Sequence, residues 1–200
     1  LENHGIIIAG NTAEEIDQRS RKLEDAIAAA LAKTEEPSAP ELDKEALDRI
    51  LTNVSPALRG LLGSEDALAV VTSDSSDLVR SATASPAGAA LAEQGPLIPD
   101  QIVYAASYPL VLDLPAEGDL VAAVETAVAE YVEKHGRKPI IAVVPGLVVL
   151  GAAADLAGAK IAVGTYVDAL RVARDANRLG TVKTMNDAAR RTREHWKAIG

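Results

Sequence analysis

Histidine is the side chain best suited to bind a transition metal in this chain, and there are three: His4, His135 and His195. His135 precedes Gly136 at the predicted end of a helix, where a positive charge interacts favourably with the helix dipole. His195 falls in a predicted C-terminal helix, which favours a packing or surface role. His4 belongs to the tripeptide 3–5 (NHG), which leads into an apolar segment and a capped helix. His4 therefore differs from the other two histidines in the segments that surround it.

Several other chemistries are excluded by what the sequence lacks. There is no cysteine, which rules out disulfides, thiolate nucleophiles and cysteine-based zinc or iron–sulfur sites. The motifs G-x-G-x-x-G, G-x-x-x-x-G-K-[ST], H-E-x-x-H and G-x-S-x-G are also missing. Three scattered histidines do not form a self-contained metal site, so no complete set of catalytic residues is predicted within the chain.

The elements next to His4 carry clear local signals. The β-branched run Ile6–Ala9, ended by Gly10, predicts a short buried strand. Thr12 followed by Glu15 is a capping box, and apolar residues at helical spacing then predict a helix to about residue 33. Two prolines within 34–40 indicate a linker.

Strands and helices alternate through the rest of the chain, which predicts an α/β layered fold. Ser55-Pro56 is expected to open a separate turn toward Leu62, and Gly180 to end a long helix. The other expected helices lie at 44–51, 85–95, 119–135, 156–180 and 186–197, and the other expected strands at 67–71, 102–104, 110–112, 140–144 and 147–150.

The tripeptide 3–5, followed by the strand, Gly10 and the capped helix, resembles the Asn-His-Gly segment of the class II aldolase/adducin family. In that family the histidine is the third imidazole ligand of a catalytic zinc, which makes His4 the implied zinc ligand. The other two ligands come from an earlier His-x-His pair, and this sequence contains none. The resemblance therefore implies one part of a zinc site.

A narrower resemblance runs along the chain, to bifunctional rhamnulose-1-phosphate aldolase/short-chain dehydrogenase proteins. It is carried, in the family's order, by 95–104 (GPLIPDQIVY), 108–111 (YPLV), 143–147 (VVPGL), the helix 157–172 and 194–196 (EHW). Ile98 stands where the family usually has threonine. The family's lysine after the V-P-G turn is missing, so two interpretations of Pro145–Gly151 stay open: an anion site, or a tight turn between strand and helix.

These resemblances imply a fragment of a zinc-dependent enzyme that cleaves a ketose 1-phosphate of the rhamnulose type to dihydroxyacetone phosphate and an aldehyde. Zinc would act as a Lewis acid that stabilises the enediolate. Residues 1–36 would end an aldolase-type α/β/α domain, 37–180 would form a small α/β linking domain, and 181–200 would lead toward a missing NAD-binding dehydrogenase half. The absent initiator methionine also predicts a fragment. Alone, the chain is predicted to be inactive and to bind no cofactor tightly.

Composition limits the partners. Twenty-nine acidic and 20 basic residues give a net charge of −9, which disfavours nucleic acid and anionic membranes. No apolar run reaches about 18 residues and no signal peptide opens the chain, so we expect a cytoplasmic protein. The expected partners are a sugar phosphate, the remainder of the aldolase domain and further copies of the chain. Two alternatives remain: a non-catalytic adducin-like module, and a small domain that binds a sugar phosphate at Pro145–Gly151.

Overall fold

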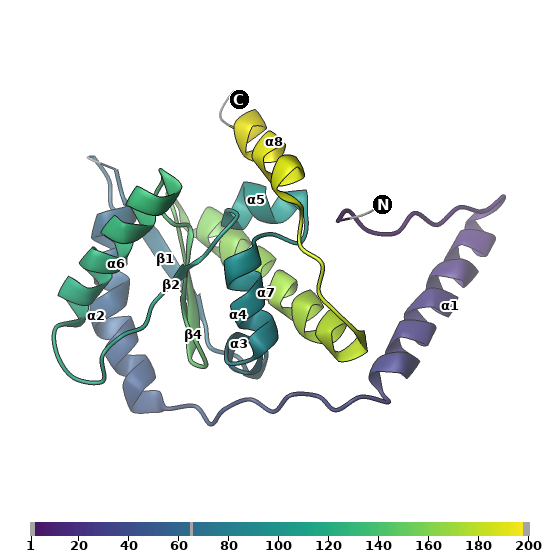
Figure 1. Ribbon diagram of the computed structural model, residues 1–200, viewed down its shortest axis with the longest axis horizontal. Coiled ribbons are helices and arrows are strands. Elements are labelled where there is room, and N and C mark those ends of the chain that lie inside the picture. The colour runs from purple at the N-terminus through teal and green to yellow at the C-terminus, as the bar shows by residue number, and fades with distance from the viewer. Residues whose placement is uncertain (1–2, 65, 198–200) are drawn as a thin grey trace.

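A four-stranded sheet separates two layers of helices in the computed structural model, which describes residues 3–64 and 66–197 (Figure 1). The strand order is β1-β4-β3-β2. β3 and β4 form an antiparallel hairpin, β1 pairs antiparallel with β4, and β2 pairs parallel with β3. The strands are β1 Val70–Asp74, β2 Leu110–Val111, β3 Ile141–Val144 and β4 Val148–Ala153. The predicted α/β class is confirmed.

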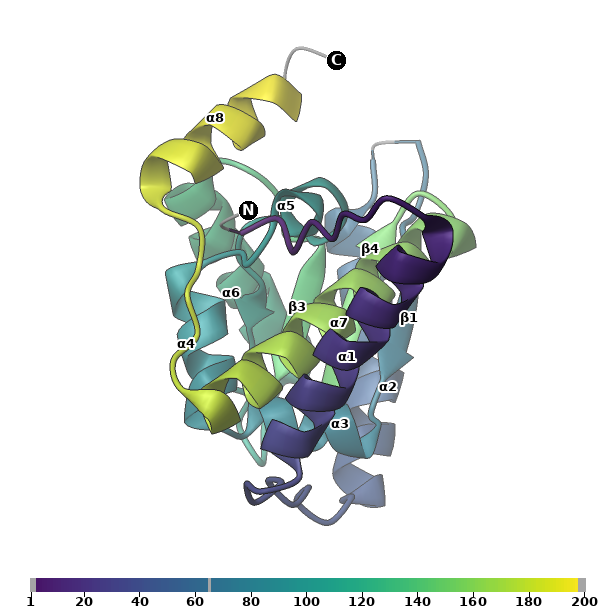
Figure 2. The same cartoon turned by 90° about the vertical axis from the view of Figure 1, so that its right-hand side faces the viewer.

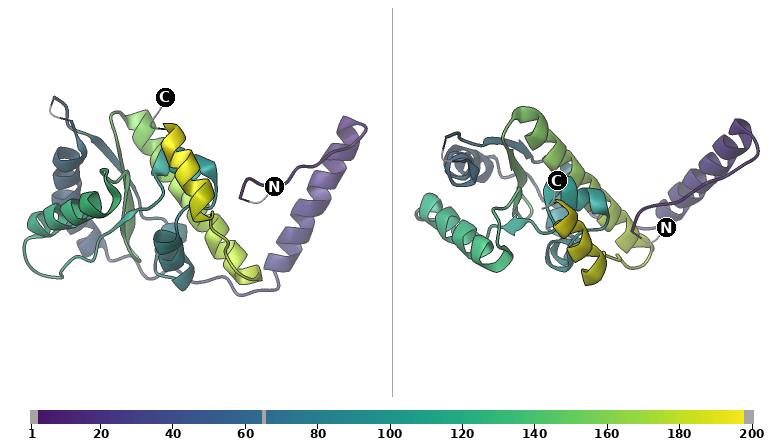
Figure 3. Two further views of the ribbon diagram at one scale, coloured as in Figure 1. Left: turned by 45° about the horizontal axis from the view of Figure 1, so that its top comes forward. Right: turned by 90° about the horizontal axis from the view of Figure 1, so that it is seen from above.

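Helices cover both faces of this sheet (Figures 1 and 3). On one face lie α2 Lys44–Leu62 and α6 Leu120–His135, and on the other lie α3 Asp77–Thr83, α4 Pro86–Gln94, α5 Pro99–Ala105 and α7 Leu156–Leu179. Side chains of the hairpin alternate between the two cores, since Ile141 and Val143 enter the α7 core whereas Ala142 enters the α2–α6 core. Buried on both faces, these strands are apolar throughout.

β4 and α7 approach each other closely because Gly151 has no side chain. A Cβ atom at residue 151 would lie 2.5 Å from Cγ2 of Val163. Tyr166 and Leu170, further along α7, are each 1% exposed. This contact fixes α7 against the sheet.

α1, Ala13–Leu31, stands apart from these layers (Figure 1), on the side that faces the viewer in Figure 2. None of its residues is buried. Its capping box forms with a shift of one residue: Thr12 accepts a hydrogen bond from the Glu15 N–H, and the Glu15 carboxylate accepts one from the Asn11 N–H. At the other end, the guanidinium of Arg178 donates to the Leu31 carbonyl at 3.0 Å. α1 is therefore tied to α7 mainly at its C-terminal end.

The predicted strand Ile6–Ala9 is wrong. The segment has no strand assignment, and Ile6 and Ile7 are 67% and 73% exposed. β-branched residues favour an extended backbone, but a strand also needs a neighbouring strand to satisfy its N–H and C=O groups. Among the described residues, the four strands of the sheet do not include a partner for it.

Three further predictions needed correction. Residues 102–104 are helical in α5, because Pro99 at the first helical position pre-sets the backbone angle. Pro56 lies inside the continuous helix α2, where Val54 and Leu58 on either side are anchored in the core. β1 starts at Val70 instead of residue 67, since the Ala69 N–H bonds the end of α2 at the Arg59 carbonyl.

The remaining predicted elements agree with the structure. α4, α6, β3, β4, α7 and α8 (Asp187–Lys197) lie close to their predicted positions, and β2 falls within predicted strand 110–112. No helix in the described part of the chain is long and apolar enough to cross a membrane.

Candidate functional site

His4 lies on a turn that is held against two distant parts of the chain. Asn3 adopts a left-handed conformation with φ 55°. Its side-chain amide donates to the carbonyls of Leu97 at 2.9 Å and Lys183 at 3.0 Å. Leu97 and Lys183 are themselves brought together, because the Met185 N–H donates to the Pro96 carbonyl at 2.8 Å. We call this meeting of residues 3–5, 96–97 and 183–185 the Asn3 junction.

The junction leaves the His4 side chain exposed. Among residues 3–64 and 66–197, no group of three or more histidine, cysteine, aspartate or glutamate side chains is placed to hold a metal ion. His135 and His195 lie elsewhere, His135 in an aromatic cluster and His195 exposed on α8. The three histidines therefore do not converge, and His4 stands as one ligand donor without a complete site around it.

The motif 95–104 has a structural explanation in this geometry. Gly95 has φ +96°, and a Cβ atom there would lie 3.3 Å from the Tyr108 ring. The buried Gln101 side chain accepts a hydrogen bond from the Leu97 N–H at 3.0 Å. These contacts shape the segment whose carbonyls receive the Asn3 and Met185 hydrogen bonds. The motif thus builds one wall of the Asn3 junction.

Residues 145–147 connect β3 to β4 in a hairpin, so the predicted turn between strand and helix is wrong: the turn joins two strands. Gly146 has φ +73°, and its N–H donates to the Thr83 hydroxyl at 2.9 Å. Gly151 lies within β4. The N-terminus of α7 is capped by its own carboxylate, since Asp155 accepts from the Gly158 N–H at 2.7 Å. This arrangement favours a structural turn, here between two strands, over an anion site.

An aromatic and charged cluster fastens α8 to the rest of the molecule. The Arg190 guanidinium lies 5.3 Å from the centre of the Tyr108 ring and 2.9 Å from the Glu194 carboxylate. Glu194 also accepts a hydrogen bond from Ser107. The Tyr131 hydroxyl donates to the Tyr108 carbonyl at 2.8 Å, and burial raises the pKa of Tyr131 to about 12. Glu194 of the 194–196 motif therefore has a packing role. The side chain of Trp196, in the same motif, lies outside the part of the chain that the structure describes.

His135 makes the stabilisation that this cluster provides depend on pH. Its ring stacks on Tyr108 at 5.0 Å and lies 4.4 Å from the Tyr131 ring. Burial lowers the pKa of His135, positive charges on Lys134 and Arg190 lower it further, and Glu194 opposes them. As pH falls, the His135 imidazole is therefore protonated in the unfolded chain before it is protonated in the folded chain. The stabilisation from neutral His135 is thus complete above its ordinary pKa of about 6.5 and is lost as pH falls through the lowered folded value.

We therefore expect acidification from about pH 7.5 to about pH 5.5 to lower the melting temperature more in the wild type than in His135→Gln, which cannot take up the proton. Differential scanning calorimetry of both proteins at the two pH values measures this difference. His195→Gln, at an exposed position on α8, is the matched control and should follow the wild type. Equal losses in wild type and His135→Gln would contradict the assignment.

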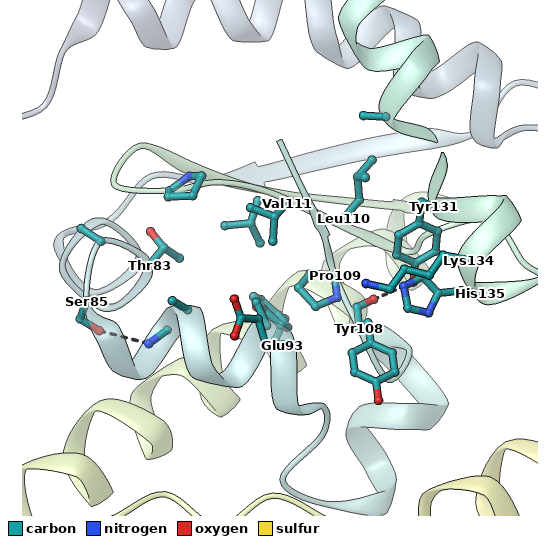
Figure 4. Close-up of a pocket in the computed structure, with 18 of the residues that line it drawn as sticks. Thr83, Ser85, Glu93, Tyr108, Pro109, Leu110, Val111, Tyr131, Lys134 and His135 are labelled. Atoms are coloured by element: carbon teal, nitrogen blue, oxygen red, sulfur yellow. Dashed lines mark hydrogen bonds between the residues drawn. The ribbon is translucent and has the colours of Figure 1, made fainter. Parts of the chain in front are cut away.

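A cleft of about 960 Å³ opens between α4 and α6, with the edge strand β2 between them (Figure 4). Thr83 and Ser85 line one end, and Tyr131, Lys134 and His135 line the other (Figure 4). No signal in the sequence indicates this cleft, because its lining comes from six separate elements and their connections. Its other lining residues are Ala84, Pro86, Gly88, Ala89, Ala92, Glu93, Tyr108, Pro109, Leu110, Val111, Ala127, Glu130, Val143, Pro145 and Tyr166.

Comparison with known protein families identifies the family of this chain. Residues 49–198, which are 150 of the 200 residues, match the family described as "Aldolase class II, second domain". Comparisons with curated proteins and with solved structures returned no significant match. The match includes the 95–104 motif, the α8 cluster and the cleft, and it begins after the Asn3-His4-Gly5 turn. Because the family covers three quarters of its length, this chain belongs to the class II aldolase second-domain family.

Proposed function

We propose that this chain is part of a zinc-dependent class II aldolase that cleaves a ketose 1-phosphate of the rhamnulose type to dihydroxyacetone phosphate and an aldehyde. The observation that supports it most is the Asn3 junction. An exposed imidazole is held, through Asn3, against Leu97 and Lys183 of the matched second domain. Such an anchored, accessible histidine is suited to ligate a metal that other residues help to bind.

The described residues do not by themselves fit a catalytic zinc, which has three protein ligands and an open position. His4 supplies one neutral imidazole nitrogen, and no further group of ligands surrounds it in the described part. We propose that the companion ligands come from another segment of the complete protein. When bound there, zinc would supply a Lewis acid for the substrate oxygens. The part played by this chain is to hold His4 in place through Asn3.

The exposed apolar face of the N-terminal segment supports a partner of this kind. Ile6 and Ile7 are largely exposed, and Ile16 and Ile27 on α1 are 39% and 42% exposed. We propose that residues 1–36 pack against the remainder of an aldolase domain, that 37–180 are the linking domain, and that 181–200 lead to an NAD-dependent dehydrogenase half. A cytoplasmic homo-oligomer with a sugar phosphate as substrate completes the proposal.

The test compares residues 1–200 with the complete gene product. Zinc content is measured by mass spectrometry, and cleavage of rhamnulose 1-phosphate is followed by a coupled assay for dihydroxyacetone phosphate. We expect about one zinc per chain and cleavage in the complete protein, and neither in residues 1–200. A complete protein that folds but binds no zinc and cleaves no ketose 1-phosphate would contradict the proposal and favour a non-catalytic adducin-like module.

A further inference from the structure

Tyr166 is a buried tyrosine whose hydroxyl has no partner within the described part of the chain. The residue lies on α7, is 1% exposed and belongs to the core that includes Val143 and Val163. Burial raises the pKa of Tyr166, which keeps its hydroxyl protonated and able to donate. The Tyr131 hydroxyl, by contrast, donates to the Tyr108 carbonyl. Buried hydroxyls are nearly always hydrogen-bonded, so the Tyr166 hydroxyl points to a missing partner.

Tyr166 lines the cleft between α4 and α6 together with Val143 of β3. Within residues 3–64 and 66–197, the fully enclosed side-chain atoms without a partner are Thr72 Oγ1 and Arg190 Nε. The Tyr166 oxygen is not one of them, so it keeps a small accessible area, and the space that the residue lines is the cleft. A ligand in the cleft can therefore reach it.

The other hydroxyl groups along the inner cleft are engaged. Thr83 Oγ1 donates to the Val79 carbonyl at 2.6 Å and accepts from Gly146. Ser85 Oγ donates to the Ala82 carbonyl at 2.6 Å and accepts from the Gly88 N–H. Tyr108 is half-exposed at the rim (Figure 4). The Tyr166 hydroxyl is thus the inner hydroxyl that is available to hydrogen-bond a ligand.

The charges and walls of the cleft indicate what kind of ligand this would be. The charged side chains that line it are two exposed carboxylates, Glu93 and Glu130, and the ammonium of Lys134, a mixture that does not favour an anion. Alanine, proline, valine and leucine make up ten of the twenty lining residues. We propose that the cleft binds small uncharged organic molecules with an apolar body and one hydroxyl or carbonyl oxygen, which hydrogen-bonds the Tyr166 hydroxyl. This proposal does not rest on zinc chemistry at His4.

A peptide strand is a poorer fit to the same cleft. β2 has only two residues, and Pro109 before it has no N–H to offer. The Leu112 N–H donates to the Val143 carbonyl, so the backbone groups of Leu112 face β3. Adjacent residues of a strand point their N–H and C=O groups to opposite sides. Val111 is therefore the β2 residue whose backbone groups face away from β3. Short strands and prolines are the features that protect sheet edges against strand addition.

Benzyl alcohol, toluene and benzyl phosphate are matched probes, since they share one ring and differ in the hydroxyl and the charge. Binding is followed by amide chemical shifts in two-dimensional NMR spectra of the whole chain. We expect benzyl alcohol to bind with a Kd on the order of 1 mM and to shift the amides of Ala92 and Val111. Toluene and benzyl phosphate should bind more weakly.

Tyr166→Phe removes only the unpartnered hydroxyl, so the fold should be kept. It should weaken benzyl alcohol about 5- to 10-fold and leave toluene unchanged. Tyr131→Phe, which also removes a hydroxyl from a cleft-lining tyrosine, should leave the affinity for benzyl alcohol unchanged because that hydroxyl is already bonded to Tyr108. Ala92→Leu, which fills the cleft from α4, should weaken both neutral probes.

The outcomes separate the alternatives. Equal binding of benzyl alcohol to wild type and Tyr166→Phe would overturn the proposal and leave water as the only partner of the hydroxyl. Tighter binding of benzyl phosphate would indicate an anion site instead. If the blocked dipeptide acetyl-Val-Val-amide shifted the same amides at a concentration about ten times lower, strand addition on β2 would replace the small-molecule assignment.

Discussion

Replacing His4 by alanine in the complete gene product is expected to lower zinc affinity by more than about 100-fold and to abolish ketose 1-phosphate cleavage. Loss of an outer contact to a metal ligand already costs about 10- to 100-fold in affinity, and loss of the ligand itself costs more. Because His4 is exposed and Asn3 keeps its two hydrogen bonds to Leu97 and Lys183, the fold should survive. Zinc titration and the dihydroxyacetone phosphate assay measure both effects.

Two further variants make this result interpretable. Asn3→Ala removes both anchoring hydrogen bonds but keeps the imidazole, so we expect a loss about 10-fold smaller than that of His4→Ala. His195→Ala removes an exposed imidazole on α8 and should change neither zinc affinity nor cleavage. Full zinc binding and activity in His4→Ala would show that His4 is not a ligand.

Gly88→Ala is expected to destabilise the fold by about 3 kcal/mol or more, the largest effect on stability that we predict. Gly88 is buried in α4, where the helix passes close to the end of α3. A Cβ atom there would lie 2.2 Å from the Ala82 carbonyl oxygen and 3.0 Å from the Thr83 Cα. Both atoms belong to the backbone, so rotation of a side chain cannot relieve the overlap. Urea unfolding followed by circular dichroism gives the free energy of unfolding.

Gly60→Ala is the matched control for this substitution. Gly60 also lies inside a helix, α2, but no atom would lie within 4 Å of its added Cβ. Alanine there should stabilise the protein by about 0.5–1 kcal/mol through the higher helix propensity of alanine. A Gly88→Ala protein as stable as the wild type would mean that α3 and α4 do not pack as closely as described.

Local signals predicted most of the fold correctly. Thr12, Ser85 and Asp119 each cap the helix that the sequence assigns to them, and Gly136 ends α6 in a left-handed conformation. These signals are reliable because a free N–H or C=O at a helix end is satisfied by a residue only a few positions away. The β3–β4 hairpin was predicted as two strands for a similar reason: an apolar run broken by Pro145-Gly146.

The errors arose where partners far along the chain decide the structure. Ile6–Ala9 has the composition of a strand, yet pairing depends on a neighbour that the segment itself cannot specify. Three apolar residues at 102–104 suit a strand or a helix equally, and the useful signal was Pro99 ahead of them. The polar residues Thr72 and Asp74 extend β1 because it lies at the edge of the sheet.

The candidate sites, too, could be predicted from the sequence only where their residues are close together along the chain. The Asn-His-Gly tripeptide and the 95–104 motif are contiguous, so the aldolase family could be recognised from sequence, and the family match confirms it. The Asn3 junction, however, joins residues 94 and 180 positions apart. In the sequence, Tyr166 is one residue of the predicted helix 156–180. Its unused hydroxyl becomes visible only when α4, β2 and α7 surround the same cleft.

The strand order also constrains how the chain folds as it is synthesised. The two central strands, β3 and β4, are adjacent in sequence, but β1 pairs with β4 between Val70 and Ala153. β1 and β2 are thus made before the hairpin that lies between them. β2 lacks its partner β3 until about residue 144 has left the ribosome, and β1 lacks its partner β4 until about residue 153 has done so. Val70 and Val71 remain an unpaired apolar edge during that interval. Nascent chains that stop between β1 and β4 are therefore the form of this protein most exposed to aggregation.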